Sequence, residues 1–357
     1  MSTFRTTFVR ASRAATRPSV SSFAKATRPL SVSARLYKGE VVSEKEIHST
    51  SYVIDPVTGS PKALHKSIPV QDHETEVSSE PESDPVVPLT REAYEKMSPM
   101  MQKMTLMDKV VIVTGGARGL GNNMARACVE AGAKSIAIFD ANQELGDESA
   151  AELHAKTGLP IRFYKVDVRD GDAIIDAVND VVKHFGTPDV LINSAGIADS
   201  NIKAEDYDHG MFRRLIDINL TGTFLMSQAV GKAMMAAGKP GSIVLVASMS
   251  GTVVNYPQEQ SCYNASKAGV VQFGKSLAAE WAKFGIRVNC ISPGYMDTAL
   301  NRVPALDAQK KIWTSLTPQN RLGAVDDLNG LAVYLSSDAS AFQTGSNVLI
   351  DGGYSLW

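Results

Sequence analysis

Seven short apolar runs recur along residues 105–357, and apolar positions do not alternate with polar ones inside them. Many of their residues are β-branched. Uninterrupted runs of this kind are typical of strands that are buried on both faces of a parallel sheet. The seven predicted strands are Val110–Val113, Ser135–Phe139, Ile161–Val166, Val190–Ile192, Ser242–Val246, Ile286–Ile291 and Asn347–Ile350.

Amphipathic stretches with helical spacing separate these runs. Examples are Asn122–Ala131, Ala173–Phe185, Tyr207–Ala237 and Ala265–Lys283. Strands and helices that alternate on this scale form right-handed βαβ units. We therefore predict one α/β domain over residues 105–357, a doubly wound, seven-stranded parallel sheet of the Rossmann type with helices on both faces.

Residues 40–104 carry no sustained periodicity and are rich in proline, serine and glutamate. This composition predicts a mostly disordered linker. Near its end, residues 89–104 place Met97, Met100, Met101 and Met104 at helical spacings. Because a methionine stripe usually packs against other apolar side chains, we expect a helix here that docks on the core.

The first 39 residues contain eight lysines and arginines and twelve serines and threonines, and no acidic residue precedes Glu40. Such a segment is typical of a mitochondrial transit peptide, and it holds no apolar stretch long enough for a secretory signal. The sequence therefore predicts a protein of the mitochondrial matrix. A disordered basic tail on a cytosolic protein is the alternative.

Composition narrows the function classes further. Of 357 residues, 44% are hydrophobic and 21% are charged, and the formal net charge is −2. This balance argues against nucleic-acid binding, which needs a basic surface. No run of about eighteen apolar residues occurs, so no membrane span is expected. Cys128, Cys262 and Cys290 lack metal-ligand spacing, so we expect buried thiols and no metal site.

A glycine-rich loop follows the first predicted strand and precedes a predicted helix. Its glycines allow a tight turn and the close approach of a pyrophosphate, and the free N–H groups at the helix start attract that anion. In this strand–helix context the loop predicts a dinucleotide-binding site. The predicted binding residues in the loop are Gly115, Arg118, Gly119, Leu120 and Gly121.

Asp140 ends the second predicted strand, about twenty residues beyond the last loop glycine. A carboxylate there accepts hydrogen bonds from the adenosine ribose and repels a 2′-phosphate, which favours NAD. Arg118 favours NADP instead, because a guanidinium pairs with that phosphate. We expect NAD and leave NADP open. After the third strand, Asp167 and Val168 contact the adenine, or Asp167 caps the next helix.

Tyr263 and Lys267 stand four positions apart in a predicted helix, which places the phenol and the ammonium on one face. Other polar or small residues follow strands or lie in a nearby helix, namely Asn193, Ala195, Gly196, Asn219 and Ser248. Open α/β sheets bind ligands at the carboxyl ends of their strands, so we expect one shared site there.

With these residues the chain resembles the short-chain dehydrogenase/reductase family over about residues 105–357. The resemblance rests on a Thr-Gly-x-x-x-Gly-x-Gly loop at 114–121, Asn-Ser-Ala-Gly at 193–196, Asn219, Ser248, Tyr263-x-x-x-Lys267 and Pro293-Gly294. It implies an NAD(P)-dependent alcohol dehydrogenase that works without a metal ion.

The resemblance also implies roles. Tyr263 is the general acid/base, while Lys267 binds the nicotinamide ribose and lowers the pKa of the tyrosine. Ser248 hydrogen-bonds the substrate oxygen, and Asn219 holds a water molecule of the proton relay. The residues implied beside the nicotinamide carboxamide are Pro293, Met296 and Thr298.

Ser250 is the alternative to Ser248. It lies thirteen positions before Tyr263, whereas Ser248 lies fifteen before it, and many family members have the shorter spacing. We prefer Ser248 because it follows the fifth predicted strand directly.

Within the family, residues 248–267 and 351–357 resemble fungal polyol dehydrogenases, most closely D-arabinitol 2-dehydrogenase, with mannitol dehydrogenase, sorbose reductase and xylulose reductase nearby. This implies hydride transfer between a polyol and a ketose, such as D-arabinitol and D-ribulose or D-xylulose. Asn255, Gln258 and Gln260 suit a polyhydroxylated substrate, because each desolvated hydroxyl needs a partner. Alternatively, these amides satisfy loop backbone.

Two rival functions remain. A mitochondrial 3-oxoacyl thioester reductase uses the same tetrad but needs NADPH, which Asp140 disfavours. A non-catalytic cofactor-binding scaffold is expected to lack Tyr263 or Lys267, and both are present. The helices predicted at 207–237 and 265–283 resemble those that pair subunits in the family, which implies a homo-oligomer, either a tetramer or a dimer.

Overall fold

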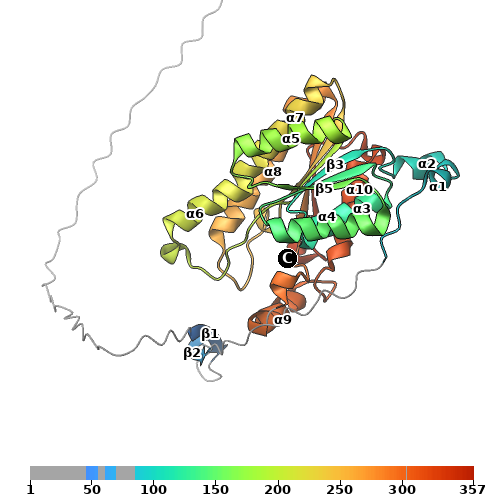
Figure 1. Cartoon of the computed structure of the whole chain (residues 1–357). Coiled ribbons are helices and arrows are strands. Elements are labelled where there is room, and N and C mark those ends of the chain that lie inside the picture. Colours follow the sequence, from blue (N-terminus) through green and yellow to red (C-terminus); the bar gives the residue numbers. More distant parts are fainter. Residues whose placement is uncertain (1–45, 55–60, 70–84, 303) are drawn as a thin grey trace, which may run out of the picture. The chain divides into compact units, whose positions relative to one another are not determined.

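All seven apolar runs form strands of one parallel sheet (Figure 1). In this computed structural model the chain is described over residues 46–54, 61–69, 85–302 and 304–357. The strands are β3 (Val110–Thr114), β4 (Ser135–Asp140), β5 (Ile161–Lys165), β6 (Val190–Asn193), β7 (Gly241–Val246), β8 (Ile286–Pro293) and β9 (Asn347–Ile350). Their spatial order is β5-β4-β3-β6-β7-β8-β9, which confirms the predicted Rossmann-type sheet.

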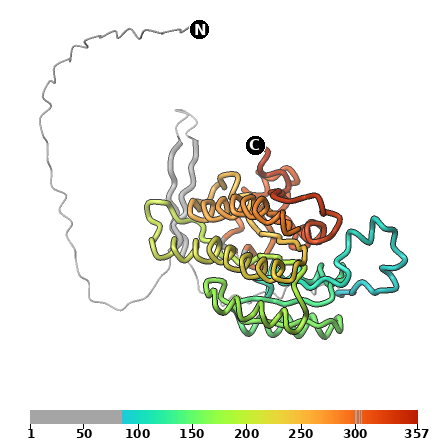
Figure 2. The backbone as a smooth tube through the Cα atoms, turned by 90° about the horizontal axis from the view of Figure 1, so that it is seen from above, coloured from blue at the N-terminus to red at the C-terminus, as the bar shows by residue number. Residues whose placement is uncertain are grey.

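Helices cover both faces of this sheet. One layer consists of α3 (Gly119–Glu130), α4 (Gln143–Thr157) and α10 (Asn329–Ser336). The other consists of α5 (Gly171–Phe185), α7 (Gly222–Ala236) and α8 (Ser261–Trp281), which run side by side in Figure 2. Alternate residues of β3 enter opposite cores, Ile112 under α7 and Val113 under α3, and both are fully buried.

The strand order reverses between β3 and β6. From β3 the chain builds outward through β4 and β5, and then it crosses back to add β6 on the other side of β3. At such a switch point the loops after the two neighbouring strands diverge and leave a crevice at the carboxyl edge of the sheet. We therefore expect the site at the carboxyl ends of β3 and β6, next to the loops that follow β7 and β8.

The stretch predicted as one helix over 207–237 is divided. It consists of α6 (His209–Ile216), a π-helical segment (Asp217–Thr221) and α7. A further helix, α9 (Asp307–Leu316), was not predicted. Short 3-10 segments are Ala204–Asp206, Met249–Gly251, Ala282–Phe284, Ala299–Asn301, Pro304–Leu306, Val325–Leu328, Asp338–Ser340 and Tyr354–Leu356.

The docking helix predicted over 89–104 is wrong in two respects. The segment forms two short helices, α1 (Arg91–Glu95) and α2 (Pro99–Lys103), because Ser98 caps a new helix and Pro99 suits its first position. In addition, Met100 and Met101 are 63% and 53% exposed. The buried apolar residues that flank these helices are Val86 and Leu106.

Upstream, β1 (Glu46–Ile54) pairs antiparallel with β2 (Pro61–Pro69), two strands that the linker prediction for residues 40–104 did not include. β-Branched and aromatic residues in β1 favour a strand. The hairpin belongs to a separate unit, Met1–Glu76. The transit peptide predicted over residues 1–39 lies outside the described residues.

The cysteine prediction holds at two of three positions. Cys128 and Cys290 are buried free thiols, whereas Cys262 is only partly buried, since it lies in the first turn of α8. Within the described ranges, no three His, Cys, Asp or Glu side chains gather as a metal-binding group. None of the helices described is long and apolar enough to cross a membrane.

Candidate active site

The glycine loop between β3 and α3 adopts a backbone that favours glycine. Gly115 and Gly119 have φ of +63° and +61°. A Cβ atom on Gly121 would lie 2.2 Å from the carbonyl oxygen of Gly115, well inside van der Waals contact. The loop therefore stays thin, and the first N–H groups of α3 are left for a ligand rather than for side chains.

Thr114 joins this loop to the one that follows β6. Its hydroxyl donates to the Asn193 side-chain oxygen at 2.9 Å and accepts the N–H groups of Ser194 and Ala195, each at 3.0 Å. Asn193 is itself held, because its amide donates to the Thr223 carbonyl at 3.0 Å. These hydrogen bonds thus fix the glycine loop after β3 and the loop after β6 to each other, so the predicted cofactor residues in the two loops are held together.

Asp140 lies at the end of β4 beside the glycine loop. Its carboxylate accepts the N–H groups of Ala117 at 3.2 Å and Asn142 at 3.0 Å. Arg118 is exposed in the same loop, and Leu120 is partly buried. Asp140, which favours NAD, and Arg118, which favours NADP, therefore both lie at the glycine loop. The carboxylate of Asp140 is the more tightly held of the two.

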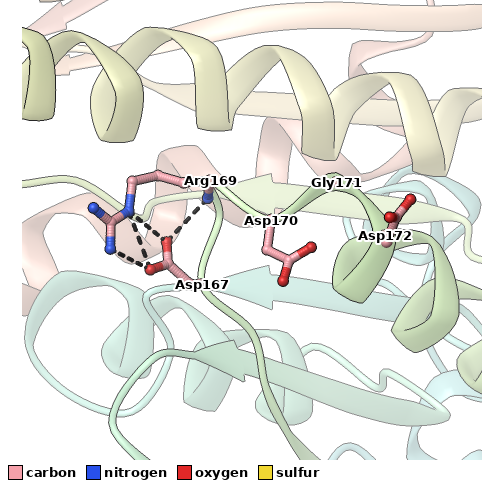
Figure 3. A pocket seen from close by; sticks show the side chains of 5 residues that line it. All are labelled: Asp167, Arg169, Asp170, Gly171 and Asp172. Carbon is pink, nitrogen blue, oxygen red and sulfur yellow. Dashed lines mark hydrogen bonds and ion pairs between the residues drawn. The ribbon is translucent and has the colours of Figure 1, made fainter.

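Asp167 forms an ion pair with Arg169, which holds the pKa of the carboxyl below its usual range (Figure 3). The predicted alternative that Asp167 caps the next helix is wrong. Asp170 is the N-cap of α5, and its carboxylate accepts the N–H of Ala173 at 3.0 Å. These residues line a shallow depression, while Val168 is buried. Contact with an adenine stays a prediction.

Asn219 lies in the π-helical segment and is fully buried. Its amide accepts the N–H of Ile197 at 2.9 Å, and it donates to the Ile197 carbonyl at 2.9 Å and to the Ser266 hydroxyl at 3.1 Å. Both amide protons are therefore used in fixing the loop after β6 against α8. The water-holding role implied for Asn219 stays a prediction.

Lys267 extends from α8 under the loop after β6. It is 5% exposed, and its ammonium donates to the Val246 carbonyl at 2.9 Å. Burial lowers the pKa of Lys267 to about 8. A Cβ atom on Gly196 would lie 3.4 Å from the ammonium and 3.2 Å from the Asn219 oxygen, so all three groups converge.

Tyr263 lies one helical turn before Lys267, whose ammonium is 5.8 Å from the centre of the phenol ring. Burial raises the pKa of Tyr263, and a hydrogen bond with Ser248 offsets part of that increase. The implied lowering of this pKa by Lys267 is therefore not found in the chain alone, because desolvation of the phenolate is the dominant effect on it.

The two candidate serines have different partners. Ser248 hydrogen-bonds Tyr263, and its oxygen also accepts the N–H of Ser250 at 3.2 Å. The hydroxyl of Ser250 instead accepts from Gln260 at 3.1 Å. The geometry thus favours Ser248 as the group that shares a substrate oxygen with Tyr263.

The loop after β8 supplies the remaining predicted cofactor residues. Pro293 ends β8, and Met296 is buried with its carbonyl accepting from Asn301 at 2.8 Å and from the N–H of Thr298 at 2.9 Å. Sequence reasoning missed Tyr295 in this loop and Trp313 in α9, whose rings stack at 4.2 Å. An aromatic residue directly after Pro293-Gly294 was the available signal for Tyr295.

Two of the three amides predicted to suit a polyol are occupied by protein groups. The Gln258 oxygen accepts from Trp313 at 2.8 Å, from Gln309 at 3.1 Å and from Tyr295 at 3.2 Å. Gln260 donates to Ser250 and also to Asn264, the latter at 3.1 Å. The partners of these two amides are side chains, so the alternative that they satisfy loop backbone is not what the structure shows.

Comparisons with known proteins agree with this geometry. A family model described as enoyl-(acyl carrier protein) reductase matches residues 115–355. An NADP-dependent mannitol dehydrogenase of Hypocrea jecorina is 42% identical over 261 residues, which cover 71% of this chain and 95% of that protein. A ribulose-forming D-arabinitol 2-dehydrogenase of Candida tropicalis is 36% identical over 280 residues, which cover 74% of this chain and 98% of that protein.

Solved structures give the same picture. A gluconate 5-dehydrogenase from Burkholderia cenocepacia J2315, in complex with NADP and tartrate, superposes with a TM-score of 0.68 at 31% identity and covers 72% of this chain and 99% of its own. An NAD+-bound xylitol dehydrogenase superposes with a TM-score of 0.65 at 32% identity and covers 70% of this chain and 99% of its own.

Gly121→Ala is expected to weaken dinucleotide binding by about tenfold or more, because the added methyl group displaces the Gly115 carbonyl and opens the loop. Fluorescence titration with NADH and NADPH measures this. Gly330→Ala in α10 is the matched control, since a Cβ there meets nothing within 4 Å. Equal affinities of wild type and Gly121→Ala would contradict the assignment of the loop.

Ser248→Ala is expected to lower kcat by about 10²-fold, whereas Ser250→Ala lowers it less than about tenfold. The reason is that, of the two serines, Ser248 is the one that hydrogen-bonds Tyr263, the expected acid/base. Steady-state kinetics with both variants distinguish the two serines, and a larger loss in Ser250→Ala would reverse the assignment.

Proposed function

Because the chain belongs to the short-chain dehydrogenase/reductase family, we propose that it interconverts a polyol and a ketose with a nicotinamide cofactor. The observation that carries this proposal is the convergence of Ser248, Tyr263 and Lys267 beside the glycine loop. The relatives support it, since those 36% and 42% identical are named polyol dehydrogenases.

The residues present fit a dinucleotide. The thin glycine loop and the start of α3 would hold its pyrophosphate, Asp140 its adenosine ribose and Lys267 its nicotinamide ribose. The residues that would surround the nicotinamide are Asn193, Ala195, Gly196, Pro293, Met296 and Thr298. When bound, this cofactor supplies the hydride acceptor for alcohol oxidation and the hydride donor for ketone reduction.

The chain supplies the proton chemistry. Ser248 holds the substrate oxygen, and Tyr263 takes the alcohol proton during oxidation and returns it during reduction. A free tyrosine has a pKa near ~10, and lowering it by about three units requires about 4 kcal/mol of extra phenolate stabilisation. Lys267, with a pKa of about 8, carries the required positive charge at neutral pH and below.

We propose NAD as the preferred cofactor. Two backbone N–H groups fix the Asp140 carboxylate at the rim, where it opposes a 2′-phosphate, whereas Arg118 is exposed and free to turn toward solvent. The relatives do not decide the matter, since the mannitol dehydrogenase is named NADP-dependent and the xylitol dehydrogenase structure is NAD+-bound.

D-Arabinitol with D-ribulose or D-xylulose is the first substrate pair to test, and the relatives' names add mannitol and xylitol. The rival 3-oxoacyl thioester reductase shares the chemistry of Tyr263 and Lys267. A spectrophotometric screen of polyols, ketoses and 3-oxoacyl thioesters with NAD(H) and NADP(H) separates the two functions. A preference for NADPH-linked thioester reduction would refute the polyol proposal.

We further propose a homo-oligomer in the mitochondrial matrix. Phe224 of α7 is 40% exposed and meets Phe273 of α8 edge to face at 6.0 Å, so this face retains apolar surface for a second subunit. Light scattering that shows a monomer at micromolar concentration would refute the homo-oligomer. Failure of residues 1–39 to direct a fluorescent protein into mitochondria would refute the mitochondrial location.

Tyr263→Phe is expected to lower kcat for polyol oxidation by about 10²- to 10⁴-fold, because it removes the only proton acceptor proposed for the alcohol, with little change in dinucleotide affinity. In the wild type, oxidation should accelerate with increasing pH, since burial raises the pKa of Tyr263 and the reaction needs its deprotonated form. Reduction should slow with increasing pH for the same reason. Persistent activity in Tyr263→Phe would contradict its role.

A further inference from the structure

The loop after β5 lies beside the carboxylate that we propose for the adenosine ribose. Lys165 of β5 pairs with Asp140 of β4, and the N–H of Val166 donates to the Asp140 carbonyl at 2.9 Å. β4 lies between β5 and β3, the strand that carries the glycine loop. A base that extends from this ribose away from the pyrophosphate therefore lies over the loop after β5.

Burial alternates along this loop. Val166 and Val168 are 2% and 8% exposed and belong to the core on the α7 side of the sheet. A Cβ atom on Gly222 of α7 would lie 2.6 Å from a methyl group of Val168. In contrast, Asp167 is only partly buried and Arg169 is exposed. The surface that this loop offers to a base is therefore made by the side chains of Asp167 and Arg169.

These two side chains form a closed pair (Figure 3). Oδ1 of Asp167 accepts the backbone N–H of Arg169 and its Nε–H, each at 3.0 Å. Oδ2 accepts from Nη2 of Arg169 at 2.5 Å and from the same Nε at 3.1 Å. A carboxylate offers about four acceptor positions, so Arg169 occupies most of the hydrogen-bonding capacity of Asp167.

An amino group on the base would have to compete with Arg169 for this carboxylate. The amino group is a neutral donor, whereas the guanidinium is charged and binds both oxygens of Asp167 in a fixed fork geometry. Arg169 is also the main group that holds the pKa of Asp167 below its usual range, with a smaller contribution from Arg214 of α6. The exchange is unfavourable, because it would leave the guanidinium without its counter-charge.

The closed pair still offers a surface to a base. It lines a depression together with Asp170, Gly171 and Asp172. A guanidinium is planar and stacks on aromatic faces, and its pairing with the carboxylate makes the combined group nearly neutral. Every purine has such a face, so contact by stacking tolerates different exocyclic groups. Recognition of this kind selects for a flat ring rather than for an amino group.

We propose that Arg169 recognises the cofactor base by stacking on it and that, by occupying Asp167, it prevents selection for the amino group of adenine. This inference rests on the nicotinamide cofactor of the proposed function and names the contact at its adenosine end. A free carboxylate at position 167 would instead accept from an adenine amino group and repel the carbonyl oxygen that hypoxanthine has at the same carbon. Arg169 thus makes the site tolerant of either purine.

Two dinucleotides that differ in the base alone test this inference. NADH and reduced nicotinamide hypoxanthine dinucleotide carry the same dihydronicotinamide, whose fluorescence reports the binding of both to the full-length protein. We expect the wild type to bind them with dissociation constants within about threefold of each other, because stacking does not distinguish them. If the substrate screen favours NADP, the pair that carries the 2′-phosphate takes their place.

Arg169→Ala frees the Asp167 carboxylate. NADH should then bind about 3- to 10-fold more weakly than to the wild type, because stacking is lost. The hypoxanthine dinucleotide should bind at least about tenfold more weakly than NADH, because the free carboxylate repels its carbonyl oxygen. Arg169→Lys separates the two effects. Its ammonium keeps a positive charge beside Asp167 but has no planar face, so both dinucleotides should lose the same share of affinity.

Arg162→Ala is the matched control, because Arg162 of β5 pairs with Asp180 and its side chain is 47% exposed, like that of Arg169. It should leave both dissociation constants unchanged. An equal ratio of the two constants in wild type and Arg169→Ala, or a wild type that prefers NADH by about tenfold, would overturn the inference and leave the polyol function intact. Binding of neither dinucleotide to the wild type would refute the proposed cofactor itself.

Discussion

The site depends on an ammonium group buried in the core with a carbonyl oxygen as its partner. Lys267 donates to Val246, and no carboxylate pairs with it in the described part of the chain. Desolvation of a cation is costly, so its pKa falls toward neutrality and the group stays responsive to its surroundings. The backbone above it leaves little room for a side chain, which favours glycine at position 196. Asn219 then fixes that backbone from the other side.

This arrangement separates two tasks. Several polar side chains hydrogen-bond to each other and to backbone groups, among them Thr114, Asn193 and Asn219. These bonds make the walls of the crevice rigid. The groups that we propose to meet the reactants, Ser248 and Tyr263, are held by fewer hydrogen bonds. Rigid walls allow a small number of polar groups to be placed accurately, which is the main contribution that a protein makes to hydride-transfer chemistry.

The loop after β7 is held by a hydrogen-bond network of the same kind. A tryptophan that can only donate fixes the orientation of the Gln258 amide, whose oxygen also accepts from Gln309 and Tyr295. Most of the polar groups there are satisfied internally, and the Asn255 oxygen is the one that has no hydrogen-bond partner among the described residues.

Much of the fold and part of the site followed from the sequence. The seven strands were predictable because strands buried on both faces must be continuously apolar, and the loop at 115–121 was predictable because close backbone approach excludes side chains. The π-helical segment at Asn219, the exposure of Met100 and Met101 and the cap at Asp170 were not, since each depends on neighbours distant in sequence or on a helix boundary.

The choice between Ser248 and Ser250, and the difference in pairing between Gln258 and the Asn255 oxygen, required tertiary structure. Both depend on which partner reaches which atom, and those partners come from α8, α9 and the loop after β8. Local sequence determines which groups are available, because composition and spacing are properties of the chain. Only folding decides which of those groups are already paired and which are left unpaired.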